Sequence, residues 1–177
     1  MNWTKYLPVE NYTLATKLSV QEVRNRIEDN IGAKEQYSLF SFKNNITKPY
    51  VGQLKGNTFT INRVINYRNS FLPIIKGEIS EFTGQPRIHI KMRPATMVLV
   101  FISAWLGIAG ITCLIMLFTV VVQSREIMQH GISPVMLGPF AMFCFGYLLT
   151  YFAFKLESKK SKEFLQNLFV AEEVNDQ

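Results

Sequence analysis

Two long uncharged stretches decide the fold of this chain. The first is PATMVLVFISAWLGIAGITCLIMLFTVVVQS at residues 94–124, and the second is GISPVMLGPFAMFCFGYLLTYFAF at residues 131–154. A helix that spans a membrane needs about 20 mostly apolar residues, and both stretches are longer than that. The six residues between them include one arginine, one glutamate and one histidine. The sequence therefore predicts a transmembrane hairpin over residues 94–154, with spans at about 95–122 and 133–154.

The charges beside the hairpin predict its orientation. Residues 1–93 carry 14 Lys and Arg against 7 Asp and Glu, and three of these basic residues lie within 87–93, just before the first span. Four lysines follow the second span, within 155–162. Because lysine and arginine accumulate on the cytoplasmic side of membrane spans, we expect both termini in the cytoplasm and residues 123–131 outside. The expected location is a bacterial inner membrane, in which the chain is an integral protein.

Residues 1–93 have the pattern of a small cytoplasmic α+β domain. Apolar and polar side chains alternate over residues 12–18, which indicates a strand. Ser19 and Glu22 then form a capping box that begins a helix, and Gly32 ends it. One side of this helix is apolar and the other is charged, so we expect it to cover a sheet.

The rest of the domain has the pattern of an antiparallel meander. Gly56 and Asn57 form a two-residue hairpin turn between two alternating segments. Polar or proline-containing turns separate the other segments. Strands are expected at residues 37–42, 50–55, 58–67, 74–82 and 87–93.

A helical cytoplasmic tail, residues 155–177, is expected after the hairpin. Its apolar side either docks on the domain or lies on the membrane surface, and we expect the residues from Ala171 onward to fray. The predicted fold class is thus α+β: a small antiparallel meander with one covering helix, then a two-helix transmembrane hairpin and a helical tail. The apolar side of the tail consists of Phe164, Leu165, Leu168 and Phe169.

The last strand of the meander has one apolar and one basic face. Ile88, Ile90 and Met92 alternate with the basic residues, so the apolar side chains are predicted to face the core. Membrane topology alone explains basic residues just before a span. Binding of anionic lipid head groups is the functional alternative. The residues of this candidate lipid site are Arg87, His89, Lys91 and Arg93.

Arg63 is the first candidate for ligand or partner binding. It has the same parity as Phe59, Ile61, Ile65 and Tyr67, so its charge is predicted to point toward the core. An inward charge must be paired or must bind an anion in a pocket. A structural ion pair, with Glu78 as the first candidate partner, and a ligand-anchoring arginine are both open interpretations.

The turn that follows Arg63 is the second candidate, because polar loops with aromatic residues often bind ligands. It could equally be a well-capped connection without a binding role. Its candidate residues are Tyr67, Arg68, Asn69 and Ser70.

The composition argues against an enzyme. The chain has two histidines and two aspartates, and no pair of cysteines or histidines has the spacing of a metal site. It has no glycine-rich phosphate loop and no nucleophile elbow. No carboxylate and no basic side chain lies within either span, which argues against a pump or transporter. We expect no catalytic residues, no metal, no cofactor and no nucleic-acid partner.

One segment of the chain has a distinctive pattern, which is Gly56-x2-Phe59-x-Ile61-x-Arg63-x-Ile65-x-Tyr67-Arg68-Asn69-Ser70-Phe71-Leu72-Pro73. Two further parts of the pattern follow this segment, at Lys76-Gly77-x-Ile79 and Ile90-x-Met92-Arg93. The pattern resembles that of uncharacterised bacterial membrane proteins in which a short cytoplasmic β-rich domain precedes two spans. The order of elements is also similar to the helix-grip lipid-binding folds, with the first span in the place of their last helix and without their second helix before the meander.

These features predict a non-enzymatic, membrane-anchored binding or accessory subunit of a larger membrane assembly. Its expected partners are a bilayer with anionic head groups and either another protein or further copies of this chain. One alternative is a ligand-gated membrane effector whose β domain senses a small anionic molecule. A second alternative is an immunity-type membrane protein.

Overall fold

The computed structural model describes residues 6–33, 48–67, 69–82, 85–122 and 134–174. They form two compact units: the sheet unit, Met1–Ala95 with Ala153–Gln177, and the hairpin unit, Thr96–Phe152. The α+β class predicted from the sequence is confirmed. The strand expected at 37–42 and the candidate residue Arg68 lie outside the described residues.

The sheet unit is built on one mixed sheet with the strand order β2-β3-β4-β5-β6-β1-β7. β3 to β6 form the predicted antiparallel meander, β1 lies antiparallel between β6 and β7, and β2 pairs in parallel with β3. The strands are β1 (Glu10–Thr16), β2 (Ile31–Ala33), β3 (Tyr50–Lys55), β4 (Thr58–Arg63), β5 (Ile74–Phe82), β6 (Gln85–Arg93) and β7 (Ala171–Val174).

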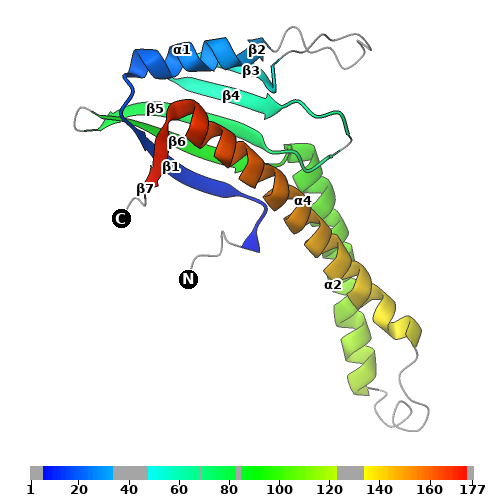
Figure 1. Cartoon of the computed structure of the whole chain (residues 1–177). Coiled ribbons are helices and arrows are strands. Elements are labelled where there is room, and N and C mark those ends of the chain that lie inside the picture. The colour runs from blue at the N-terminus through cyan, green and yellow to red at the C-terminus, as the bar shows by residue number, and fades with distance from the viewer. Residues whose placement is uncertain (1–5, 34–47, 68, 83–84, 123–133, 175–177) are drawn as a thin grey trace. The chain divides into compact units, whose positions relative to one another are not determined.

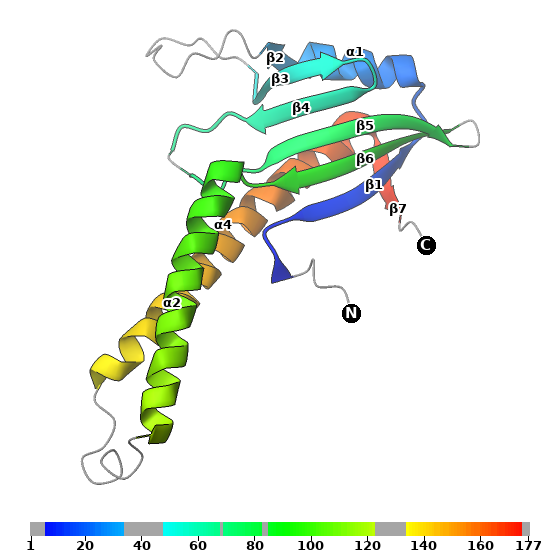
Figure 2. The same cartoon turned by 180° about the vertical axis from the view of Figure 1, so that it is seen from behind.

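Two helical segments cover one face of this sheet, which we call the inner face (Figure 1). They are α1 (Val20–Asn30) and the end of α4 (Gly138–Phe169). The predicted capping box begins α1: the Ser19 side chain accepts from the Glu22 amide, and the Glu22 carboxylate accepts from the Ser19 amide at 2.7 Å. The view from behind shows the opposite, outer face of the sheet (Figure 2).

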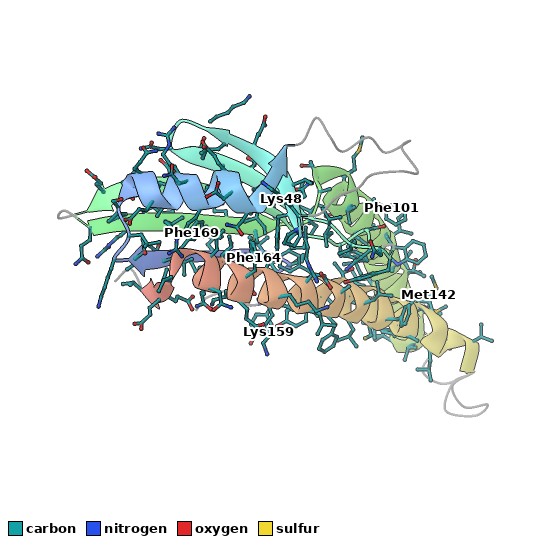
Figure 3. The ribbon with its side chains drawn as sticks, turned by 45° about the horizontal axis from the view of Figure 1, so that its top comes forward. Lys48, Phe101, Met142, Lys159, Phe164 and Phe169 are labelled. Atoms are coloured by element: carbon teal, nitrogen blue, oxygen red, sulfur yellow. The ribbon has the colours of Figure 1, made fainter. Side chains whose placement is uncertain are left out.

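Apolar side chains from both layers fill the space between sheet and helices. Ile88, Ile90 and Met92 of β6 are at most 1% exposed, as their alternation predicts. Phe164 and Phe169 lie between α4 and α1, and Lys159 lies on the opposite side of α4 (Figure 3). The apolar side of the tail therefore docks on the domain. The buried core includes Leu14, Val23, Ile27, Tyr50, Phe59, Ile61, Ile75, Ile79, Phe154 and Leu165.

Polar side chains bind the last carbonyls of α4. The guanidinium of Arg26, on α1, donates to the carbonyl of Leu168 at 2.8 Å. The hydroxyl of Thr16, at the end of β1, donates to the carbonyl of Phe169 at 2.7 Å. The last turn of a helix leaves carbonyls without intrahelical partners, and a cation there also complements the helix dipole. These bonds fix the end of α4 to both α1 and the sheet.

One expectation about the tail is wrong. Residues 171–174 do not fray, because they form β7 and pair with the otherwise open edge of β1. The helix that covers the sheet after the meander is the end of α4.

The hairpin unit contains two apolar helical segments. The first is α2 (Thr96–Val122). The second begins with η3 (Pro134–Leu137) and continues into α4, so that one helical stretch extends from Val135 to Phe169. Both helices are long and apolar enough to cross a membrane. Gly110 faces the ring of Phe143, and Gly146 faces Trp105, where an added Cβ would lie 3.2 Å from the indole nitrogen. Small residues therefore permit close approach of the two segments. The connecting residues 123–133 lie outside the described residues.

Candidate functional site

Arg63 lies at the end of β4 on the inner face of the sheet. Phe59 and Ile61, which share that face, are at most 1% exposed, whereas the Arg63 side chain is 26% exposed. Its Nη1 donates to Oε2 of Glu157, on α4, at 2.5 Å. The structure thus places Arg63 inward, as its parity predicts, and pairs it with a carboxylate.

The Glu157 carboxylate accepts hydrogen bonds from three side chains. Its side chain is only 4% exposed. Besides the bond from Arg63, its Oε1 accepts from the Tyr67 hydroxyl at 2.5 Å and from Nζ of Lys160 at 3.1 Å. A buried carboxylate is tolerated only when it is paired and hydrogen-bonded, and this one is both. We call Arg63, Tyr67, Glu157 and Lys160 the Glu157 cluster.

The hydrogen bonds of the Glu157 cluster shift the pKa values of two of its members. Burial acts to raise the pKa of Glu157, but the bonds from Tyr67, Lys160 and Arg63 outweigh it, so this pKa lies below its ordinary value of 4.5. The hydrogen bond to Glu157, with a smaller contribution from burial, raises the pKa of Tyr67 above its ordinary value of 10.0. Both shifts favour an ionised Glu157 beside a neutral tyrosine.

Glu78 is not the partner of Arg63, so that prediction is wrong. Glu78 lies directly opposite Thr58 of β4 and His89 of β6. Residues directly opposite share a face, and Thr58 has the other parity from Arg63, so Glu78 points to the outer face. The actual partner comes from a helix 94 residues further along the chain, which strand parity cannot reveal.

Further polar contacts tie α4 to the sheet beside the Glu157 cluster. Nζ of Lys155 donates to Oε1 of Glu10 at 2.9 Å, and the Ser158 hydroxyl reaches the same oxygen at 3.3 Å. The Tyr50 hydroxyl donates to the Ser161 hydroxyl at 3.2 Å. Polar bonds and apolar packing therefore hold the docked segment together, with Phe154 and Leu165 in the core beside these polar contacts. The Glu157 cluster likewise joins β4 and the turn after it to α4.

The turn after β4 divides into residues that join the Glu157 cluster and residues that do not. Tyr67 belongs to it. Oδ1 of Asn69 instead accepts from the Phe71 amide at 2.9 Å, which is the hydrogen bond of an Asx turn. Ser70 is exposed, and Phe71 packs against the core. Asn69 therefore has a local role in shaping the turn.

Sequence reasoning missed Glu157 and Lys160. A signal existed, because Glu157 is the single acidic residue among four lysines just after an apolar stretch. It also lies on the same helical side as Phe154 and Ser161, at spacings of three and four. A carboxylate on the apolar side of an amphipathic tail predicts a buried partner, and Arg63 was the inward cation available.

The basic residues of β6 lie on the outer face, opposite the core. Lys91 and Arg93 are exposed, and Arg87 and His89 are partly buried. Nδ1 of His89 lies 2.9 Å from the hydroxyl of Thr13 on β1. The four residues are therefore aligned on one strand face, as their alternation predicts, and their role at lipid head groups stays a prediction.

Among the described residues, no group of three or more His, Cys, Asp or Glu is arranged to hold a metal ion. Cys113 is buried and Cys144 is exposed, and both are free thiols within the hairpin unit. Comparisons with protein-family models, with curated proteins and with solved structures found no match.

Proposed function

We propose that this chain is a non-enzymatic, membrane-anchored binding module that serves as an accessory subunit of a larger membrane assembly. The observation that carries the proposal is α4, a single helix from Gly138 to Phe169. Its first part supplies an apolar segment, and its part from Ala153 onward belongs to the sheet unit. One continuous helix therefore supplies both an apolar segment for membrane anchoring and part of the core of the sheet unit.

The surface of the hairpin unit supports membrane insertion. Large apolar side chains such as Phe118, Ile108 and Phe145 are exposed along both helical segments. Soluble proteins rarely expose apolar surface on this scale, so lipid or partner helices must cover it. The basic flanks at 87–93 and 155–162 support a cytoplasmic sheet unit.

The contacts of the inner face favour a binding module over a sensor of small anions. Arg63, the candidate anchor for an anion, already has a carboxylate partner in Glu157. Phe59, Leu165 and Phe169 are fully or almost fully buried where the helix meets the sheet. Because its own helices occupy the inner face, the outer face is the sheet surface that we propose for partner contacts.

Purification of the tagged full chain from membranes in mild detergent tests the proposal. We expect a second protein at fixed stoichiometry, and we expect that protein, when tagged in turn, to capture this chain. The variant Glu28→Gln, at an exposed position of α1 outside the candidate sites, serves as a control and should capture the same protein. A homo-oligomer without any second protein would contradict the accessory-subunit function and would favour the effector alternative.

A further inference from the structure

The register of the sheet places two lysines side by side on the outer face. Lys76 of β5 lies directly opposite Lys91 of β6. Both side chains are exposed, and so is that of Arg93, two residues further along β6. Like charges that face each other across strands destabilise a sheet. An anion bound between them removes that repulsion.

Membrane topology explains the basic residues of β6 but not Lys76. Lys76 precedes Thr96, the first residue of α2, by 20 residues (96 − 76) and belongs to a different strand. Only the fold brings it beside Lys91. The nearest acidic residue on these two strand faces, Glu78, lies opposite His89, on the side away from Arg93. Within the described part of the chain, the side chains of Lys76, Lys91 and Arg93 form no hydrogen bond or ion pair.

The covalent chain limits how far these cations can lie from the first apolar helix. Arg93 precedes Thr96 by three residues, and Lys91 precedes it by five. An extended chain advances at most about 3.6 Å per residue, so their Cα atoms lie within about 11 Å and about 18 Å of that helix. Electrostatic attraction extends over about 8 Å at physiological salt, and the lysine and arginine side chains add their own reach. Arg93 is therefore within electrostatic range of a head group at the start of that helix, and Lys76 faces Lys91, its near neighbour on β6.

We propose that Lys76, Lys91 and Arg93 form a binding site for the head groups of anionic phospholipids. The inference rests on the membrane anchoring in the proposed function and names the class of molecule that one end of the outer face recognises. A phosphodiester between the two lysines accepts hydrogen bonds from both ammonium groups, and Arg93 adds a third donor. The site extends the basic face of β6 by one residue that the sequence alone did not assign to it.

Native mass spectrometry of the full chain in a non-ionic detergent tests this site. Phosphatidylglycerol and phosphatidylcholine are titrated separately, and the dissociation constant of the bound lipid is measured. The variant Lys76→Gln/Lys91→Gln removes two charges from the site. The control variant Lys17→Gln/Lys55→Gln removes two charges from exposed positions elsewhere on the sheet unit.

We expect the wild type to prefer phosphatidylglycerol, and we expect Lys76→Gln/Lys91→Gln to bind that lipid about 30-fold more weakly. Phosphatidylcholine binding should not change, and the unfolding temperature should not fall, because the variant also removes the repulsion between the two lysines. The control variant should bind within twofold of the wild type. An equal loss in both variants, an unchanged affinity, or no preference between the two lipids would overturn the proposal. Capture of a second protein by the wild type is measured separately. Lipid preference without a captured protein contradicts only the proposed function. A captured protein without lipid preference contradicts only the lipid site.

Discussion

The Arg63 guanidinium and the Glu157 carboxylate, 94 residues apart in the sequence, meet at 2.5 Å where α4 reaches the sheet. This ion pair joins the last residue of β4 to the continuation of the second apolar segment. The strand contributes the positive charge of Arg63 and the helix contributes the negative charge of Glu157. Either charge without the other would be unfavourable at this mostly buried position. The docking of α4 and the inward orientation of Arg63 therefore depend on each other.

Arg63→Met should destabilise the sheet unit by about 1–3 kcal/mol, because Glu157 stays buried with one donor fewer. Urea unfolding of the purified chain in detergent, followed by circular dichroism, measures the effect. Arg63→Met/Glu157→Leu should recover most of the loss, since no buried charge remains. Glu78→Gln is the matched control and should be neutral, because Glu78 is exposed on the outer face. A loss with Glu78→Gln as large as with Arg63→Met would refute the pairing.

The pH dependence of stability should report Glu157. Its pKa is lowered in the folded protein, so its contribution is fully present above the ordinary value of 4.5. That contribution should be lost as the pH falls from about 4.5 through the folded pKa, because the unfolded state then binds more protons. Unfolding experiments between pH 7 and pH 3 should show a shallower decrease for Glu157→Gln than for the wild type. Parallel curves would show that Glu157 does not titrate as the structure implies.

The register of β6 predicts opposite results for two neighbouring residues. Ile90 is 1% exposed within the core, so Ile90→Asp buries an unpaired carboxylate and should cost more than about 3 kcal/mol or prevent folding. Lys91 is exposed on the outer face, so Lys91→Asp should change stability by less than about 1 kcal/mol. Thermal unfolding in detergent distinguishes the two. Similar losses for both variants would mean that the strand faces are misassigned.

Gly77 leaves room for the ring of Phe59. A Cβ at Gly77 would lie 2.1 Å from Cζ of that ring, closer than any real contact allows. Gly77→Ala should therefore destabilise the sheet unit by about 1–3 kcal/mol through overpacking. Gly77→Ala/Phe59→Leu should be less destabilised than the sum of the two single variants, because the shorter side chain relieves the clash. Strict additivity in a denaturant series would contradict this packing.

The orientation of the chain can be measured by cysteine labelling in intact cells. With Cys113 and Cys144 replaced by Ala, a membrane-impermeant maleimide should modify a cysteine introduced by Gln129→Cys and should spare one introduced by Asn57→Cys. Labelling after cell lysis should then modify both. The reverse pattern in intact cells would place the sheet unit outside and would remove the basis for a cytoplasmic lipid site.

Much of the sheet was predictable because the relevant signals are local. The capping box at Ser19 needs only four consecutive residues, and the turn at Gly56 needs a residue that tolerates its positive φ of 57°. The alternation in β6 predicts its buried face from nine residues. The strand β7 was missed because Ala-Glu-Glu-Val has no alternating apolar pattern, and its formation depends on the open edge of β1.

By itself the sequence determined the two apolar helices, the basic flanks and the inward parity of Arg63, because hydrophobicity and periodicity act over neighbouring residues. Only the tertiary structure decided what lies against Arg63 and what lies beside Lys91. Glu157 reaches Arg63 because α4 continues past its apolar stretch onto the sheet, and Lys76 reaches Lys91 because β5 and β6 pair in one register. Both contacts join residues that are distant in the sequence, so the pattern around either residue does not by itself identify its neighbour.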